Sequence, residues 1–142
     1  MSQPNSPRTK DNSAKPETLS PQIVIENLMQ EIIDKGHYDA AFLFSLEGLP
    51  LAQAISDIDI DQAGLVKVSL ILKDLQNMIK TIADIEDLRE IVIEGVNRRK
   101  VVFRFLEIFG QPSILAVITT PRKSYKGLTN QLIRTINKVM AE

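Results

Sequence analysis

The 142-residue sequence contains no cysteine and no tryptophan, and His37 is its only histidine. The absence of cysteine excludes disulfides, thiol nucleophiles and thiolate metal sites. A single histidine excludes histidine clusters that would hold a metal, and it argues against a Ser-His-Asp catalytic arrangement. The residue types therefore predict a protein that is not an enzyme and that carries no metal and no cofactor.

A charge excess and long apolar segments are also missing. Lys and Arg number 17 against 18 Asp and Glu, which gives a net charge of −1, whereas a nucleic-acid-binding domain usually carries a marked basic excess. No segment approaches the roughly 18 consecutive apolar residues of a membrane-spanning helix, and the N-terminus lacks the apolar core of a signal peptide. We therefore expect no nucleic-acid partner, no membrane span and a cytoplasmic location.

The first 19 residues differ in composition from the rest of the chain. They are mainly Ser, Pro, Asn, Thr and Lys, with almost no apolar side chains. Such a segment cannot bury enough surface to offset the entropy that is lost when it becomes ordered. We predict a disordered tail at residues 1–19 and one folded domain at residues 20–142, which is long enough to bury one hydrophobic core.

A helix is predicted to follow the tail. Ser20 is a good N-cap, and Pro21 suits the first helical position. Apolar residues then recur at the spacing of one helix face, namely Ile25, Leu28, Met29 and Ile32. Gly36 is predicted to be the glycine that caps the C-terminal end of this helix.

Five later segments show strand patterns. Two are continuously apolar, as expected for central strands that are covered on both faces, and they are residues 38–46 and 113–119. The other three are residues 49–55, 88–94 and 100–108. Pro50 favours a sheet edge for the second segment along the chain, because proline cannot donate to a ladder.

A long helix is predicted from Asp57 to about Ile82, and a last helix from about Arg122 to Met140. The order of elements is therefore α-β-β-α-β-β-β-α. Hairpin-like connections between consecutive strands indicate a five-stranded antiparallel sheet. Because two strands are apolar on both sides, helices are needed on both faces of this sheet.

The long helix carries apolar side chains on two faces. The broader face is expected to pack on the sheet and contains Ile60, Gly64, Leu65, Val68, Ile71, Leu72, Leu75, Met78, Ile79 and Ile82. A second stripe, on the opposite side, consists of Ala63, Val66 and Leu70 and continues through Lys73 and Asn77. Single exposed apolar residues need no explanation, but the a and d spacing favours a helix–helix contact between subunits.

Two further segments carry candidate contacts. If the strand at residues 88–94 lies at a sheet edge, it can pair with its own copy in a second chain. The densest basic cluster, Asn97 to Lys100, lies on the predicted hairpin turn that follows this strand. A solvated turn is the simpler interpretation of the cluster, and contact with an acidic partner or a phosphate is the alternative.

The segment Glu47-Gly48-Leu49-Pro50-Leu51-Ala52 follows an apolar strand and precedes the long helix. With the order of elements, this motif resembles the roadblock/LC7 family over about residues 21–141. The resemblance implies a profilin-like α+β sandwich, with the first and last helices on one face of the sheet and the long helix on the other. Members of the family commonly dimerise through the long helix and the third strand.

The resemblance also implies a function. Bacterial members of the MglB type act on an MglA-like GTPase, so it predicts a dimeric, non-catalytic regulator of a Ras-like small GTPase that binds through the long central helix. A phosphate-binding G-x-x-x-x-G-K-[ST] loop is absent, so the chain is not itself a P-loop GTPase. The partners implied are a GTPase and either a second copy or a related roadblock chain.

Helical geometry and the family pattern together select the residues expected at a partner or dimer interface. They are Ala63, Val66, Lys67, Leu70, Lys73, Asp74, Asn77 and Val92. Arg98 and Arg99 are candidates for an arginine finger in an alternative, catalytic mode of GTPase activation. A nucleotide-independent adaptor subunit is the alternative function. A small-ligand sensor is a third, but the sequence shows no convergent polar groups to line its pocket.

Overall fold

The computed structural model describes residues 20–56, 60–108, 110–119 and 124–141. The described residues form α2 (Pro21–Gly36), β1 (Ala40–Ser45), β2 (Pro50–Ile55), α3 (Gln62–Ala83), β3 (Glu90–Glu94), β4 (Lys100–Ile108), β5 (Gln111–Thr119) and α4 (Lys126–Ala141). This is the predicted order of elements. The predictions for residues 1–19, 57–59 and 122–123 lie outside the described residues.

The strands form one antiparallel sheet in the order β2-β1-β5-β4-β3. The two continuously apolar segments became β1 and β5, which are neighbours in the interior of the sheet and are buried along nearly their whole length. The strand that begins at Pro50 is one edge, as predicted. The other edge is β3.

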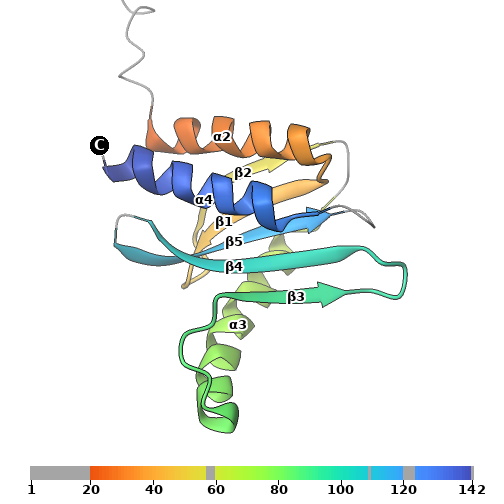
Figure 1. Cartoon of the computed structure of the whole chain (residues 1–142), viewed down its shortest axis with the longest axis vertical. Helices are drawn as coiled ribbons and strands as arrows, with labels where there is room; N and C mark the ends of the chain where they lie inside the picture. The colour runs from red at the N-terminus through yellow and green to blue at the C-terminus, as the bar shows by residue number, and fades with distance from the viewer. Residues whose placement is uncertain (1–19, 57–59, 109, 120–123, 142) are drawn as a thin grey trace, which may run out of the picture.

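Helices cover both faces of the sheet, as the apolar central strands require. Figure 1 shows α2 and α4 side by side on one face and α3 on the other. Two apolar clusters result: one lies beneath α2 and α4 and includes Leu43, Leu115 and Leu132. The second lies beneath α3 and includes Phe42 and Phe103. The predicted α+β sandwich is confirmed.

The start of α2 follows the prediction and its end does not. The Ser20 hydroxyl accepts a hydrogen bond from the Ile23 N–H at 3.2 Å, as an N-cap does. The left-handed residue that ends α2 is His37, with φ 55°, so the prediction that Gly36 has this role is wrong. Gly36 is the last helical residue, and a Cβ there would overlap the ring of Tyr38. Close packing, rather than an unusual φ, therefore requires glycine.

The long helix packs on the sheet through fewer residues than predicted. Asp61 is its N-cap, and its carboxylate accepts a hydrogen bond from the Gly64 N–H at 3.0 Å. Within α3 the buried side chains are Leu65, Ser69 and Leu72. Part of the predicted sheet-facing side is exposed instead, namely Ile71, Met78 and Ile82. In Figure 1, α3 continues beyond β3, so its C-terminal end has no sheet to pack on.

Candidate interaction surface

The outer edge of β3 is unpaired within the part of the chain that the structure describes. Its inner edge pairs with β4, with Val92 opposite Val102. Two backbone hydrogen bonds show which residues bond inward, to β4. One runs from the Gly95 N–H to the Arg99 oxygen (2.9 Å), and the other from the Phe105 N–H to the Arg89 oxygen (3.1 Å). Bonding alternates along an antiparallel strand, so the backbone groups of every second residue of β3, Val92 included, point outward.

The side chains of β3 alternate between the two faces of the sheet. Ile91 packs against the cluster beneath α3, and Ile93 lies on the same face with 49% of its surface exposed. Glu90 lies on the opposite face, where it accepts a hydrogen bond from the Tyr125 hydroxyl at 2.7 Å. Val92 shares this second face and is also exposed. The backbone of Val92 therefore belongs to the open edge, while its side chain points away from α3.

Most of the predicted interface residues on α3 are exposed. These are Ala63, Lys67, Leu70, Lys73, Asp74 and Asn77. Val66 differs, because it is half-buried and packs against the cluster beneath α3. Val66 and Leu70 also lie against Gly48 in the β1–β2 turn, where a Cβ would come within 3.3 Å and 3.0 Å of their side chains. The second apolar stripe is thus partly used inside the chain.

A more exposed apolar surface lies on the other flank of α3, and we call it the α3 flank. It consists of Ile71, Met78 and Ile82. Ile71 is 63% and Ile82 72% exposed, against 44% for Leu70. The sequence does contain a signal for this surface: a helix of 22 residues is roughly 33 Å long. Five strands span only roughly 19 Å, so part of such a helix projects beyond the sheet.

The β3–β4 turn exposes one basic side chain and one apolar side chain. Val96 is fully exposed, at 107%. Arg99 forms an ion pair with Asp39, with 2.7 Å between Nη2 and Oδ2. Arg98 adopts a left-handed conformation, with φ 74°, and its only described ion pair is a 3.9 Å contact with Glu94. Of the two predicted arginine-finger candidates, Arg99 is thus engaged within the chain.

A polar network beneath α4 fixes the start of β3. Arg104 is buried on β4, and its Nη1 donates to the Thr129 Oγ1 at 2.9 Å while its Nε lies 3.7 Å from the Glu90 carboxylate. Burial, followed by the hydrogen bond to Glu90 and the charge of Glu90, raises the pKa of Tyr125, and the charge of Arg104 partly opposes this shift. The network joins the edge strand to the α4 layer, so β3 is held in place while its outer edge stays open.

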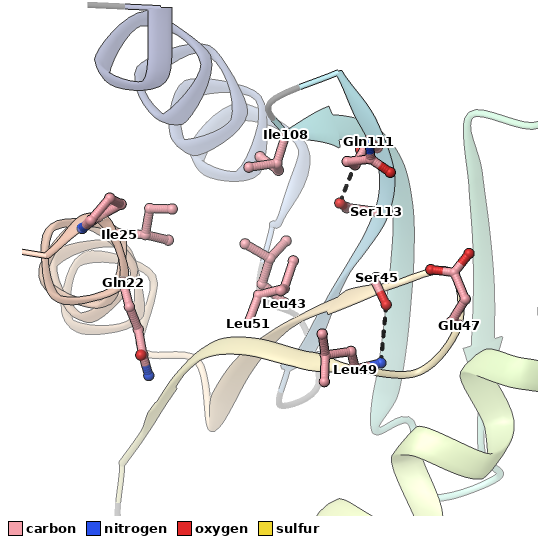
Figure 2. A pocket seen from close by; sticks show the side chains of 11 residues that line it. Gln22, Ile25, Leu43, Ser45, Glu47, Leu49, Leu51, Ile108, Gln111 and Ser113 are labelled. Carbon is pink, nitrogen blue, oxygen red and sulfur yellow. Dashed lines mark hydrogen bonds between the residues drawn. The ribbon is translucent and has the colours of Figure 1, made fainter.

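A separate cavity of about 570 Å³ lies between the start of α2 and one end of the sheet. Figure 2 shows its apolar lining, which includes Ile25, Leu43, Leu49, Leu51 and Ile108. Its hydroxyls already have backbone partners: Ser45 accepts from the Leu49 N–H at 3.0 Å, and Ser113 donates to the Gln111 oxygen at 3.2 Å. Gln22, Glu47 and Gln111 also line the cavity, which the sequence gave no sign of.

Two features of the described residues bear on the class of site. No group of three or more His, Cys, Asp or Glu among them could hold a metal ion. No helix among them has the length and apolarity needed to cross a membrane.

The fold matches solved structures over most of the chain. A structure described as MglB with a tetrameric arrangement is 13% identical, with a TM-score of 0.71 over 87% of this chain and 92% of that one. The gliding protein MglB from Thermus thermophilus is 12% identical, with a TM-score of 0.68 over 87% and 93%. A roadblock/LC7 domain from Streptomyces avermitilis is 19% identical, with a TM-score of 0.63 over 82% and 93%.

These matches confirm the resemblance that the sequence carried, and the chain has the roadblock/LC7 fold. The sequence matches no family model. It also matches no curated protein. At identities of 12–19% the likeness concerns the fold, so the function has to be argued from the surface itself.

Proposed function

We propose that this chain is a dimeric, non-catalytic regulator of a Ras-like small GTPase, acting as a GTPase-activating or scaffolding protein. One observation supports the proposal most: β3 has an open edge, and α3, which continues beyond this edge (Figure 1), has an exposed apolar flank, in a fold shared with MglB proteins. An open edge is a ready template for pairing with another chain, and exposed apolar patches mark sites of protein–protein contact.

A second copy of the chain accounts for the open edge. The outward backbone groups of β3 would pair with the same groups of the other copy and form one continuous sheet. The α3 flank and Ile93 lie on the same side of the sheet. Two copies related by a two-fold axis would bring these apolar side chains together and remove them from water.

The remaining outward side of α3 suits a polar partner surface. It carries both signs of charge on exposed side chains, through Lys67, Lys73 and Asp74, with Asn77 beside them. A regulator of this kind needs no catalytic side chain of its own, because it can act by ordering the switch loops and the water-positioning residue of the GTPase. We therefore assign these residues to GTPase contact and the α3 flank to the dimer.

The dimer is tested with Val92→Pro. The Val92 N–H points away from β4 at the open edge, so proline removes an outward donor without breaking the β3–β4 ladder. We expect a wild-type dimer and a monomeric Val92→Pro variant with unchanged circular dichroism, measured by sedimentation equilibrium. Val92→Thr, which keeps the N–H, should remain a dimer. A monomeric wild type, or a variant that dimerises as tightly as wild type, would contradict the proposal.

The GTPase is tested by capture on the immobilised chain in the presence of a non-hydrolysable GTP analogue or of GDP. We expect one small GTPase to be enriched with the GTP analogue alone, and Lys67→Glu/Asp74→Lys to abolish its capture. Lys138→Glu, an equally exposed charge change on α4, is the control and should capture normally. The identified GTPase is then purified and assayed for hydrolysis. Capture of the same partners with both nucleotides would support the adaptor instead.

A further inference from the structure

The cavity between the start of α2 and one end of the sheet is separate from the surface assigned to partners. Its floor belongs to the apolar cluster beneath α2 and α4, and its members Ile25, Leu43 and Ile108 are at most 4% exposed. Figure 2 shows these side chains and Leu51 around one space, with Ile25 contributed by α2 and the others by the sheet. The proposed dimer and GTPase contacts lie on α3 and β3, so an occupant of the cavity does not compete with them.

The mouth of the cavity keeps apolar surface in contact with water. Leu49, in the β1–β2 turn, lines the cavity and is 61% exposed. Pro21, the first residue of α2, also lines it and is exposed. An apolar molecule that enters the cavity would remove this surface, together with its own, from water. The volume of about 570 Å³ falls within the range of roughly 300–1,000 Å³ that is usual for small-molecule sites.

The polar side chains around the cavity restrict the charge of a ligand. The hydroxyls of Ser45 and Ser113 already bond to backbone groups of the chain. Glu47 is exposed and is the only charged side chain among the described residues that line the cavity. Its carboxylate disfavours an anion at the mouth, and the apolar floor offers no counter-charge for a buried ion of either sign. The exposed carboxamides of Gln22 and Gln111 can bond a neutral polar group at the mouth.

The size and the rim of the cavity favour a small molecule over a protein segment. A stable protein–protein contact buries roughly 800 Å² on each partner, whereas the space here suits one drug-sized ligand. The rim carries the exposed polar side chains of Gln22, Glu47 and Gln111. A protein surface would have to desolvate all three to reach the apolar floor, and a small molecule can pass between them.

We propose that this cavity binds a neutral, mainly apolar small molecule whose few hydrogen-bonding groups lie at the mouth. Such a ligand needs few convergent polar groups, and the lining has few to offer. The proposal also gives a role to the exposed Leu49, whose side chain forms one wall of the site. The inference does not depend on the proposed GTPase function, because no described residue of α3 or β3 lines the cavity.

The neutral fluorescent probe N-phenyl-1-naphthylamine tests the site in the full chain. Its emission rises in apolar surroundings, and we expect binding that saturates at one molecule per chain and raises the melting temperature. Leu51→Trp fills the cavity and should weaken binding at least about tenfold. Ile55→Trp, on the same strand but outside the lining, is the matched control and should bind like wild type.

Two further variants keep the test independent of folding and of the dimer. Leu49→Ala changes only the exposed wall, so it should leave the circular dichroism unchanged and weaken binding about threefold. Val92→Pro, which lies far from the cavity on the edge strand β3, should bind the probe as tightly as wild type. Loss of the dimer and loss of the ligand site are thus measured separately.

A charged analogue tests the class of ligand. The anion 1-anilinonaphthalene-8-sulfonate has the same ring system with an added sulfonate, and wild type should bind it at least about tenfold more weakly than the neutral probe. Glu47→Gln should strengthen binding of the anion about twofold and leave the neutral probe unchanged. Equal binding of both probes by wild type would refute the neutral class.

Two results would refute the site itself. One is a full chain that does not bind the neutral probe, because another segment or a second copy would then fill or close the cavity. The other is binding that survives Leu51→Trp and Leu49→Ala but is lost in Ile82→Ser, which would place the probe on the α3 flank. In neither case would the proposed β3 dimer be affected.

Discussion

The two faces of the sheet are covered to very different extents. On one face, α2 buries five of its 16 residues, and α4 packs beside it. On the other, α3 buries three of its 22 residues and leaves its apolar flank exposed. Both helices have amphipathic sequences, so the difference lies in what they pack against. The α2/α4 side is a closed core that holds the fold, while the α3 side is an open surface that is available to other proteins.

The largest expected effect on stability comes from a substitution on the closed α2/α4 side. Leu132→Ala removes a fully buried side chain from the cluster beneath α2 and α4, and it should lower the free energy of unfolding by about 2–5 kcal/mol. Ile82→Ala on the α3 flank should change it by less than about 0.5 kcal/mol. Urea denaturation in the Val92→Pro background measures both without a contribution from association. Equal losses at the two positions would refute the contrast between the faces.

A smaller effect is expected at the junction of α2 with β1. Gly36→Ala pushes a Cβ into the Tyr38 ring, whose hydroxyl is held by a 2.6 Å hydrogen bond to the Ser124 oxygen. Overpacking of this kind should lower the free energy of unfolding by about 1–3 kcal/mol. Gly127→Ala on α4 is the matched change, because a Cβ there meets nothing within 4 Å. It should be neutral or slightly stabilising. Thermal denaturation of both variants checks the pair, and a destabilised Gly127→Ala would contradict it.

The smallest effect concerns pH, and it is confined to the closed side, which holds both tyrosines. Burial raises the pKa of Tyr38 above its ordinary value of 10.0, and burial with Glu90 does the same for Tyr125. A raised folded-state pKa stabilises the protein below the unfolded value, and this stability is lost as the pH rises through the folded value. The free energy of unfolding should therefore fall above pH 10.

A comparison of variants separates the contribution of the tyrosines to this loss of stability from that of the lysines, which titrate in the same range. Tyr38→Phe/Tyr125→Phe should show a shallower loss of stability between pH 9 and about pH 11.5 than the wild-type chain. Urea midpoints at each pH provide the measurement. Parallel pH profiles for the two proteins would show that the buried phenols do not contribute.

The sequence was sufficient for the order of the elements and for part of their arrangement. Continuous apolarity placed β1 and β5 inside the sheet, and Pro50 placed β2 at an edge. The Ser20 cap placed the start of α2. These features are local, because each depends on the period of apolar residues or on the chemistry of a single capping residue. The role of Gly36 was mistaken. The cap pattern does not show how the chain turns after the helix, and the ring of Tyr38, two residues on, lies where a Cβ of residue 36 would be.

The candidate site was predicted only in part. The sequence located the long helix and the third strand as the surface of interest, and six of the seven residues named on α3 are exposed. The interface itself stays a prediction. Helical periodicity assigned Ile71, Met78 and Ile82 to the sheet, because a wheel shows direction around the helix but not where the sheet ends. The same limit made Val66 look free, although it packs toward the core.

The sequence by itself determined the order of elements, the two-sided burial of the central strands and the absence of thiol chemistry. Each of these follows from residue type and short-range spacing. Only the tertiary structure decided which flank of α3 is open, that Arg99 is engaged by Asp39, and that no other described strand pairs with the outward backbone groups of β3. These properties depend on how far the sheet extends beneath the helix and on which distant residues meet, and no local pattern encodes either one.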